Sequence, residues 1–261
     1  MKNIKIIDDL KSEFKMWGWE WETCMEGGRP LHVDNPTYYF NKDEVTSIED
    51  TLLLTMNYNP KGISWWNNDY SEKIIYTPDY SCGLIKSIDT VQCNSVIEAD
   101  LMFPKGENLW PSFWLTACDS WPPEIDIVEA YSNNCGSYKG NLKFELKWPF
   151  LYRELRFESC IHYKGDKDEH LSIDAVGVHP SIINKPVEEN WNKFKCFYTD
   201  SYVGIFINDV LVREIHDSYI MSKLKTKGMY VIFNIWPRTN KEANHDTYFP
   251  FKIRNFKVTK I

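Results

Sequence analysis

The sequence predicts an all-β fold, a sandwich of two β-sheets in a single domain, and three observations support this prediction. Short segments of alternating apolar and polar residues recur along most of the 261-residue chain, separated by turn residues. Patterns typical of helices are few, and no alternation of strands with helices indicates a parallel sheet. No repeat, linker or low-complexity segment indicates a second domain, so we assign residues 1–261 to one domain.

The first fifty residues carry mixed signals. Residues 8–17 are compatible with a short helix. Trp17, Trp19 and Trp21 follow as a dense aromatic cluster, suited either to the core or to the wall of a cleft. We favour the core, because most aromatic side chains are buried for their large apolar area.

The next part of the chain predicts two strands and a loop. Residues 51–58 are rich in Leu and Met and read as a strand, which the turn residues 59–62 end. Trp65 and Trp66 then fall in a polar segment that we interpret as a loop, where paired tryptophans favour sugar stacking over core packing. Residues 95–103 alternate apolar and polar side chains, as in a half-buried strand.

The second half of the chain predicts further strands around one long loop. The charged residues 166–186 read as that loop. Asn208 and Asp209 suit a hairpin turn with positive φ, and a phase slip between Ile253 and Phe256 indicates a bulge. The predicted strands span residues 142–148, 156–163, 194–199, 203–207, 210–215, 229–236 and 251–260.

Three carboxylates lie within six residues of one apolar, strand-like segment. On a strand, Glu124 and Asp126 share one face, and strict alternation sends Glu129 to the other face. A β-bulge at Ile127 and Val128 would reset the phase and return Glu129 to the face of the first two acids.

Such a group of acids has a chemical use. Like charges at one site raise the pKa of at least one of them. Retaining glycoside hydrolysis needs one ionised and one protonated carboxyl about 5 Å apart, and a third acid between them can hold their pKa values apart. The alternative is a solvated edge strand whose acids deter aggregation. The aromatic segment 109–115 predicts a partner strand and argues against that alternative.

The acids and their flanks resemble glycoside hydrolase family 16. The sequence E-I-D-I-V-E at residues 124–129 matches the bulged family pattern E-x-D-x-x-E, and L-W-P-S-F-W-L at 109–115 and W-P-P at 121–123 precede it. The resemblance extends from about residue 50 to the C-terminus. It implies a β-jelly-roll sandwich with a substrate cleft on its concave face, and a retaining endo-hydrolase of β-linked polysaccharide.

The match also implies roles for the three acids. Glu124 would be the nucleophile, Glu129 the acid/base and Asp126 an assisting residue. Two alternatives remain open: a non-catalytic glycan-binding jelly roll, because fold does not fix function, and a transglycosylase with the same residues.

Aromatic residues make up 15% of the chain, including 11 Trp, which is more than a core calls for and suits stacking on sugar rings. His162 lies in an H-Y-K-G segment where the family commonly has a cleft histidine, although it could equally be an ordinary polar residue. No second histidine lies at ligand spacing, so we expect no metal site there. Trp114 fits the core beneath the acids equally well. The candidate stacking residues are Trp65, Trp66, Trp110, Trp114, Trp121 and Trp236.

The resemblance leaves the substrate open among β-1,3-glucans, mixed-linkage glucans, agars, porphyrans and carrageenans. Many β-1,3-glucanases of the family have an arginine near the position of Leu84 or Ile85, and none is present here. Arg238 could contact an anionic or hydroxyl-rich sugar. These two features favour a galactan over a glucan.

Composition excludes some partners. A net charge of −7 and a pI of about 5.5 disfavour nucleic acid, which needs basic surfaces. No apolar run is long enough to span a membrane. The resemblance implies a polysaccharide or oligosaccharide substrate and no cofactor, and we expect a monomer. The family allows a structural calcium, but no clear site for it is visible in the sequence.

The seven cysteines are odd in number and lack metal or redox spacing, so we expect reduced, buried thiols. A single disulfide between Cys82 and Cys93 stays open. The N-terminus has no apolar stretch, so we expect no signal peptide, whereas family members are usually secreted. Localisation is thus open between a removed leader and a cytoplasmic or lysis-released enzyme, which the free thiols fit.

Overall fold

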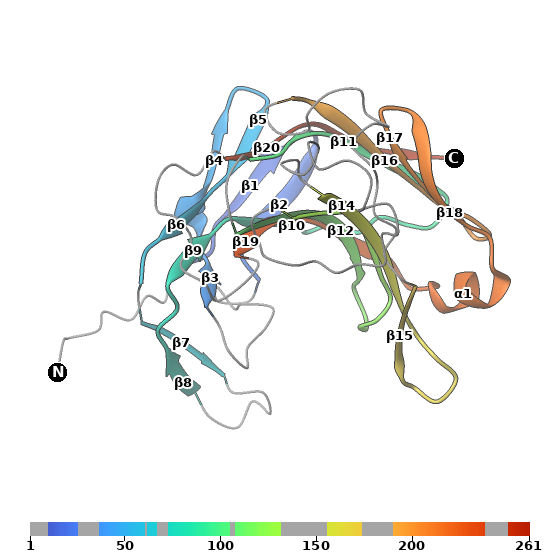
Figure 1. Ribbon diagram of the computed structural model, residues 1–261, viewed down its shortest axis with the longest axis horizontal. Helices are drawn as coiled ribbons and strands as arrows, with labels where there is room; N and C mark the ends of the chain where they lie inside the picture. The colour runs from blue at the N-terminus through green and yellow to red at the C-terminus, as the bar shows by residue number, and fades with distance from the viewer. Residues whose placement is uncertain are drawn as a thin grey trace, which may run out of the picture.

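Two large antiparallel sheets pack face to face in the computed structural model (Figure 1). The eight-stranded sheet has the order β1-β2-β10-β19-β12-β13-β14-β15, and the seven-stranded sheet β18-β17-β16-β11-β20-β5-β4. This arrangement confirms the predicted all-β sandwich. The structure describes residues 10–25, 37–60, 62–66, 73–104, 108–131, 156–173, 190–237 and 250–261.

Each sheet is built from strands that lie far apart in the sequence. The eight-stranded sheet contains β1 (Glu13–Met16), β2 (Trp19–Thr23), β10 (Leu84–Ser87), β12 (Leu109–Ala117), β13 (Glu124–Tyr131), β14 (Arg156–Lys164), β15 (His170–Ile173) and β19 (Met229–Pro237). The seven-stranded sheet contains β4 (Val45–Ile48), β5 (Thr51–Leu54), β11 (Ser95–Met102), β16 (Asn192–Tyr198), β17 (Val203–Ile207), β18 (Val210–Ile215) and β20 (Phe251–Lys260). Smaller elements are β3 (Tyr38–Phe40), η2 (Lys42–Glu44), β6 (Met56–Tyr58), β7 (Ile63–Trp66), β8 (Lys73–Tyr76), β9 (Tyr80–Cys82) and α1 (Ser218–Lys223).

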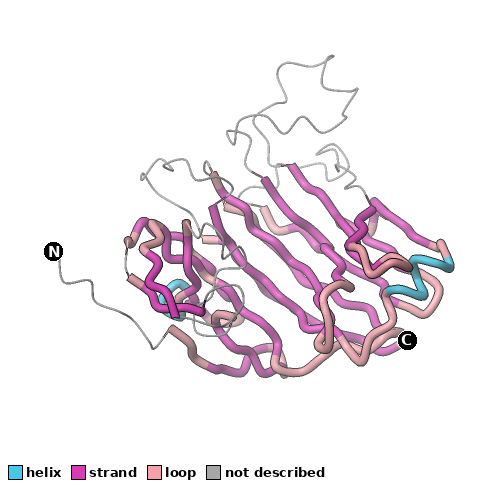
Figure 2. Tube along the Cα trace, turned by 90° about the horizontal axis from the view of Figure 1, so that it is seen from below, coloured by secondary structure: helices cyan, strands magenta, loops and turns pink. Residues whose placement is uncertain are grey.

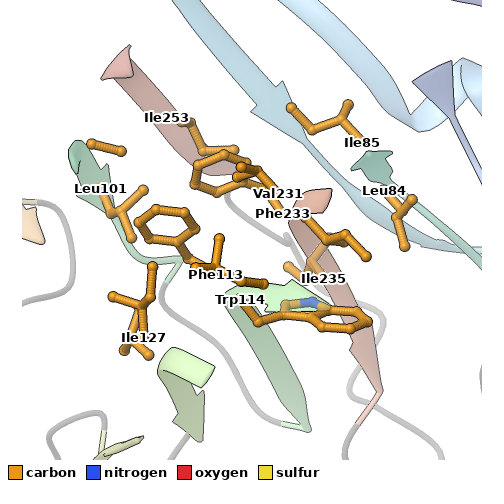
Figure 3. Packing of buried hydrophobic residues seen from close by; sticks show 14 of the residues in the cluster. Leu84, Ile85, Leu101, Phe113, Trp114, Ile127, Val231, Phe233, Ile235 and Ile253 are labelled. Atoms are coloured by element: carbon orange, nitrogen blue, oxygen red, sulfur yellow. The ribbon is translucent and has the colours of Figure 1, made fainter. Parts of the chain in front are cut away.

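The core lies between the two sheets and follows from the period of two along each strand. Strand β11 alternates buried and half-buried residues along its whole length, as predicted. Phe113 of β12 stacks on Phe233 of β19 with ring centroids 4.3 Å apart. These rings join Leu101 and Ile253 of the other sheet in one apolar cluster (Figure 3).

The face of the eight-stranded sheet that is turned away from the core is concave (Figure 1). The hairpin β7-β8 extends beyond this face at one end of the molecule and strand β15 at the other. Figure 2 views the molecule from this side and shows the long strands of the sheet lying next to one another. Side chains that point outward from β12, β13, β14 and β19 therefore share one surface.

The N-terminal region differs in part from the sequence prediction. Residues 13–16 form strand β1, paired with β2, and not the helix considered for residues 8–17. Phe14 and Met16, two residues apart, pack against the core, which is the spacing of a strand. Trp21 is fully buried and contacts Phe233 and Phe256, so the prediction of a core role for this cluster is confirmed.

Three local predictions are corrected by strand pairing. The predicted strand 51–58 is divided at Thr55, whose backbone N–H and hydroxyl both bond to Glu44. Trp65 and Trp66 lie on β7, paired with β8, and not in a loop. Residues 170–173 form β15 within the predicted loop 166–186, because they pair with β14.

The predicted hairpin turn and bulge are confirmed, and the prediction of buried, free thiols is confirmed for the described cysteines except Cys93 and Cys118, which are only half-buried. Asn208 and Asp209 have φ values of 49° and 65°. The bulge in β20 lies at Asn255, whose φ is 53°, opposite a register shift on β11. The cysteines that the structure describes are all free, including Cys82 and Cys93.

The strand predicted at 142–148 lies outside the described residues. No helix in the described part of the chain is long and apolar enough to cross a membrane.

Candidate active site

A β-bulge in β13 places the three acids on one face of the sheet. Asp126 and Val128 pair with consecutive residues of β12, so Ile127 is the extra residue. Asp126 and Glu129 consequently pair with residues of β12 that are two apart and share a face. Glu124, two residues before Asp126, lies on the same face. The bulge predicted from the sequence is confirmed.

Strand β14 adds further reactive side chains on this face, since residues directly opposite in an antiparallel pair point the same way. Sequence reasoning identified His162 but not its two neighbours. The two missed residues, Glu158 and Cys160, alternate with His162 along the predicted strand 156–163. That alternation could have placed them on the same face as His162. The pairs are Glu124 with His162, Asp126 with Cys160, and Glu129 with Glu158.

Indole N–H groups hold the two outer acids. Trp121 Nε1 donates to Glu124 Oε2 at 3.0 Å, and Trp110 Nε1 donates to Glu129 Oε1 at 2.9 Å. Hydrogen bonds to a charged acceptor are stronger than those between neutral groups. Each of these two carboxylates is therefore oriented by a tryptophan that also lies at the surface of the site.

His162 connects the acids to the next strand. Its Nε2 lies 3.2 Å from Asp126 Oδ2 and 3.7 Å from Glu124 Oε1. Its Nδ1 lies 2.8 Å from Nε2 of His170 on β15. The His170 ring in turn packs against Trp121, with centroids 4.8 Å apart. If His162 Nδ1 donates to His170, Nε2 faces the acids as an acceptor.

The acids share protons because they are buried together. Burial raises the pKa of Glu124 to about 8, and the charge of Asp126 adds to the shift. Burial raises the pKa of Asp126 well above its ordinary value, and the charge of Glu129 adds to that shift. Both shifts favour the neutral carboxyl, so the two acids share protons at neutral pH. The N–H of Trp121 favours the ionised form of Glu124.

Buried polar atoms without partners surround the acids. Ser112 Oγ, Asn234 Nδ2 and Asp126 Oδ2 make no hydrogen bond among the described residues. Ser112 lies on β12 directly between Glu129 on one side and Asn234 on the other. Because buried polar atoms nearly always have partners, these three groups are suited to bind ordered water.

The predicted tryptophans divide into two groups by exposure. Trp121 is 54% exposed and Trp110 is half-buried, so both offer ring surface beside the acids. Trp114 and Trp236 are each 6% exposed. Trp114 is fixed by its bond to Asn234 Oδ1 at 2.6 Å, and the Trp236 ring packs edge-on against Trp110. These two rings support the site from below and leave little surface for stacking.

Three predicted site residues lie beyond what the structure describes. Trp65 and Trp66 are placed by backbone on β7, but their side chains lie outside the described part. Arg238 follows the last residue of β19 and also lies outside it.

Ligand atoms of Asp126, Cys160 and His162 lie within 4.8 Å of one another. We expected no metal site from the sequence, because no second histidine lies at ligand spacing from His162, and Asp126 meets Cys160 and His162 only through the pairing of β13 with β14. Burial raises the pKa of Cys160 to about 12, with a further contribution from the charge of Asp126.

Comparison with known proteins identifies a family. The family model described as "Glycosyl hydrolases family 16" matches residues 34–252. Endo-1,3-1,4-beta-glycanase ExsH of Rhizobium meliloti is 38% identical over 53 residues, which is 20% of this chain and 11% of the relative. Galactan endo-beta-1,3-galactanase of Flammulina velutipes is 33% identical over 54 residues, 19% of this chain and 22% of the relative. These alignments thus span less than a quarter of either relative.

The fold agrees with this match. A glycoside hydrolase family 16 endo-glucanase from Bacteroides ovatus superposes with a TM-score of 0.62 and 16% identity, covering 95% of this chain and 99% of the other. That similarity concerns the jelly-roll fold alone. The family match covers the strands that carry the acids and most of both sheets, and it confirms the resemblance seen in the sequence. The chain belongs to glycosyl hydrolases family 16.

Proposed function

We propose that this protein is a retaining, endo-acting glycoside hydrolase that cleaves a β-linked polysaccharide of the galactan or glucan class. The observation that carries the proposal is the bulged strand β13, which brings Glu124, Asp126 and Glu129 to one face. Two carboxylates of different protonation on one surface are the requirement of this reaction. Membership of the family supports the same chemistry.

Glu124 is the proposed nucleophile. Its carboxylate attacks the anomeric carbon, the bond to the leaving oxygen breaks, and a covalent glycosyl-enzyme forms. Two features support this role. Burial favours the protonated form of Asp126, and the N–H of Trp121 stabilises the ionised form of Glu124. Asp126 thereby assists without touching the sugar.

Glu129 is the proposed acid/base. In the first step it protonates the leaving oxygen, and in the second it takes a proton from the water that attacks the glycosyl-enzyme. The bond from Trp110 fixes one of its oxygens. The reaction uses side chains alone, so the proposal includes no cofactor.

The substrate class rests on the surface around the acids and on relatives. Trp110 and Trp121 offer rings for stacking. The two relatives are named as a β-glycanase and a β-galactanase. No arginine stands at Leu84 or Ile85, near the position where many β-1,3-glucanases have one, which supports a galactan over a β-1,3-glucan.

The test is release of reducing ends from laminarin, mixed-linkage glucan, agarose, porphyran and carrageenan. We expect the wild type to cleave one polymer into oligosaccharides and Glu124→Gln to cleave none. Glu98→Gln, on the opposite sheet, is the matched control and should keep full activity. If the wild type cleaves none of the polymers but is retained on a glycan column, the protein is a glycan-binding module and the proposal is wrong. Products longer than the substrate would indicate a transglycosylase.

A further inference from the structure

Three side chains of different ligand chemistry meet beside the catalytic acids. The carboxylate of Asp126, the thiol of Cys160 and the imidazole of His162 offer atoms within 4.8 Å of one another. Asp126 and Cys160 are directly opposite on β13 and β14, and His162 is two residues from Cys160 on the same face. Sulfur, nitrogen and oxygen donors in one set are typical of zinc sites, which are tetrahedral.

A buried oxygen in this cluster points to a ligand. Asp126 is 4% exposed, and its Oδ2 makes no hydrogen bond among the described residues although it faces His162 Nε2 at 3.2 Å. Buried carboxylate oxygens are normally paired with a donor or bound to a cation. The position between this oxygen and the imidazole nitrogen is therefore one where an added positive charge would be stabilised.

His162 is also held as a metal ligand would be. Histidines that bind a metal through one ring nitrogen usually bond through the other to a fixed partner. Here Nδ1 is 2.8 Å from His170 Nε2, which leaves Nε2 directed at the acids. Glu124 Oε1 lies 3.7 Å from the same Nε2, so this carboxylate can approach as a fourth ligand.

We propose that Asp126, Cys160 and His162 form a reversible binding site for a divalent transition-metal ion of the zinc class, with Glu124 completing the coordination. The ion replaces the thiol proton of Cys160 and the shared carboxyl proton, and both protons leave to solvent. Bonds of about 2.0–2.3 Å hold tetrahedral ligand atoms roughly 3.5 Å apart. The side chains therefore have to draw together by about 1 Å when the ion binds.

The site has a consequence for the proposed hydrolase. An ion held by Glu124 and Asp126 takes the electron pairs with which Glu124 would attack the sugar. Zinc is therefore an inhibitor at this site and not a cofactor. Binding itself does not depend on the proposed function, because the ligands are present whatever the protein hydrolyses.

The experiment measures metal binding to the full chain by calorimetry with Zn²⁺, and by the visible spectrum with Co²⁺. We expect one ion per chain and a thiolate-to-cobalt charge-transfer band. Cys160→Ser should remove the band and weaken Zn²⁺ binding by at least about 10-fold, since losing even an outer partner costs about 10–100-fold. Cys93→Ser is the matched control, because Cys93 also lies beside a carboxylate, 3.4 Å from Asp200 Oδ1, and should bind as the wild type does.

Two results would overturn the proposal. One is the absence of saturable Zn²⁺ binding to the wild type, and the other is equal binding by wild type and Cys160→Ser. If Cys160→Ser fails to fold, as judged by circular dichroism, the wild-type cobalt spectrum decides, because a spectrum without a thiolate band excludes Cys160 as a ligand. His170→Gln gives a further readout, with Zn²⁺ binding weakened by about 10-fold and the thiolate band kept.

Discussion

The indole N–H of Trp121 donates to Glu124 Oε2 at 3.0 Å while more than half of the Trp121 surface stays exposed. One residue thus orients the proposed nucleophile with its indole N–H and leaves ring surface exposed, on which a sugar would stack in the proposed function. These two contributions can be separated, because phenylalanine keeps an aromatic face and has no N–H.

Replacing Trp121 by phenylalanine should lower kcat with little change in KM. A hydrogen bond to a charged group contributes about 1.5–3 kcal/mol, so kcat should fall by about 10-fold or more. Trp121→Ala also removes the ring and should raise KM in addition. Steady-state kinetics on the cleaved polymer measures both. Equal effects of the two variants on KM would contradict a stacking role for this ring.

The two outer acids should respond differently to substitution. Glu124→Gln removes the nucleophile and should reduce kcat by more than about 10⁴-fold, the scale for loss of one member of a catalytic unit. Glu129→Gln should cost about 10²–10⁴-fold on a polysaccharide. On an aryl glycoside with a good leaving group, Glu129→Gln should form the glycosyl-enzyme at a near-normal rate and stall there. Mass spectrometry of the trapped adduct tests the assignment, and an adduct in Glu124→Gln would reverse it.

Glu22 should make stability depend on pH in the acid range. Burial raises its pKa, but hydrogen bonds from Lys11 and Lys86 outweigh burial, so the pKa is lowered overall. A lowered pKa in the folded state stabilises the fold above the unfolded value of about 4.3 and the effect is lost as pH falls through the folded value.

The measurement for Glu22 is urea unfolding of wild type and Glu22→Gln between about pH 3 and pH 7. The wild type should be the more stable protein at neutral pH, and the difference should shrink as pH falls below about 4. A difference that stays constant over this range would show that the ion pairs do not act through the charge of Glu22.

The stacked pair in the core should be costly to disrupt. Phe113 is fully buried and lies against Phe233 with an angle of 12° between the rings. Phe113→Ala should lower the free energy of unfolding by about 3–5 kcal/mol, because it removes apolar contact and leaves a cavity. Chemical denaturation measures the loss. Phe206→Ala, at a half-buried position on β17, is the control and should cost clearly less.

Local pattern was enough to predict the acids and their bulge. Glu124, Asp126 and Glu129 lie on a single strand, and the phase of one strand is visible in its own residues. The approach of Cys160 and His170 to the acids could not be predicted, because these residues reach the acids only through the pairing of β13, β14 and β15. Contacts between residues of different strands depend on strand pairing, which the local sequence pattern does not show.

The exposure of individual tryptophan side chains could not be predicted from the sequence either. Trp236 and Trp121 look alike as candidates for stacking, yet Trp236 is covered by neighbouring rings from β3 and β12. The helix considered for residues 8–17 was wrong where the structure describes it. A short amphipathic segment fits both the helical period of 3.6 and the strand period of two. Pairing with β2 makes it a strand.

The extra residue in β13 makes the chemistry depend on the register of one strand. Ile127 and Val128 are both buried at 1% exposure, so the core holds the bulge in place. If β13 slipped by a single residue, Glu129 would turn toward the interior while the number of paired strands stayed the same. Catalysis would then cease in a molecule whose circular dichroism is unchanged, and on gentle heating the loss of activity should precede the loss of β-structure.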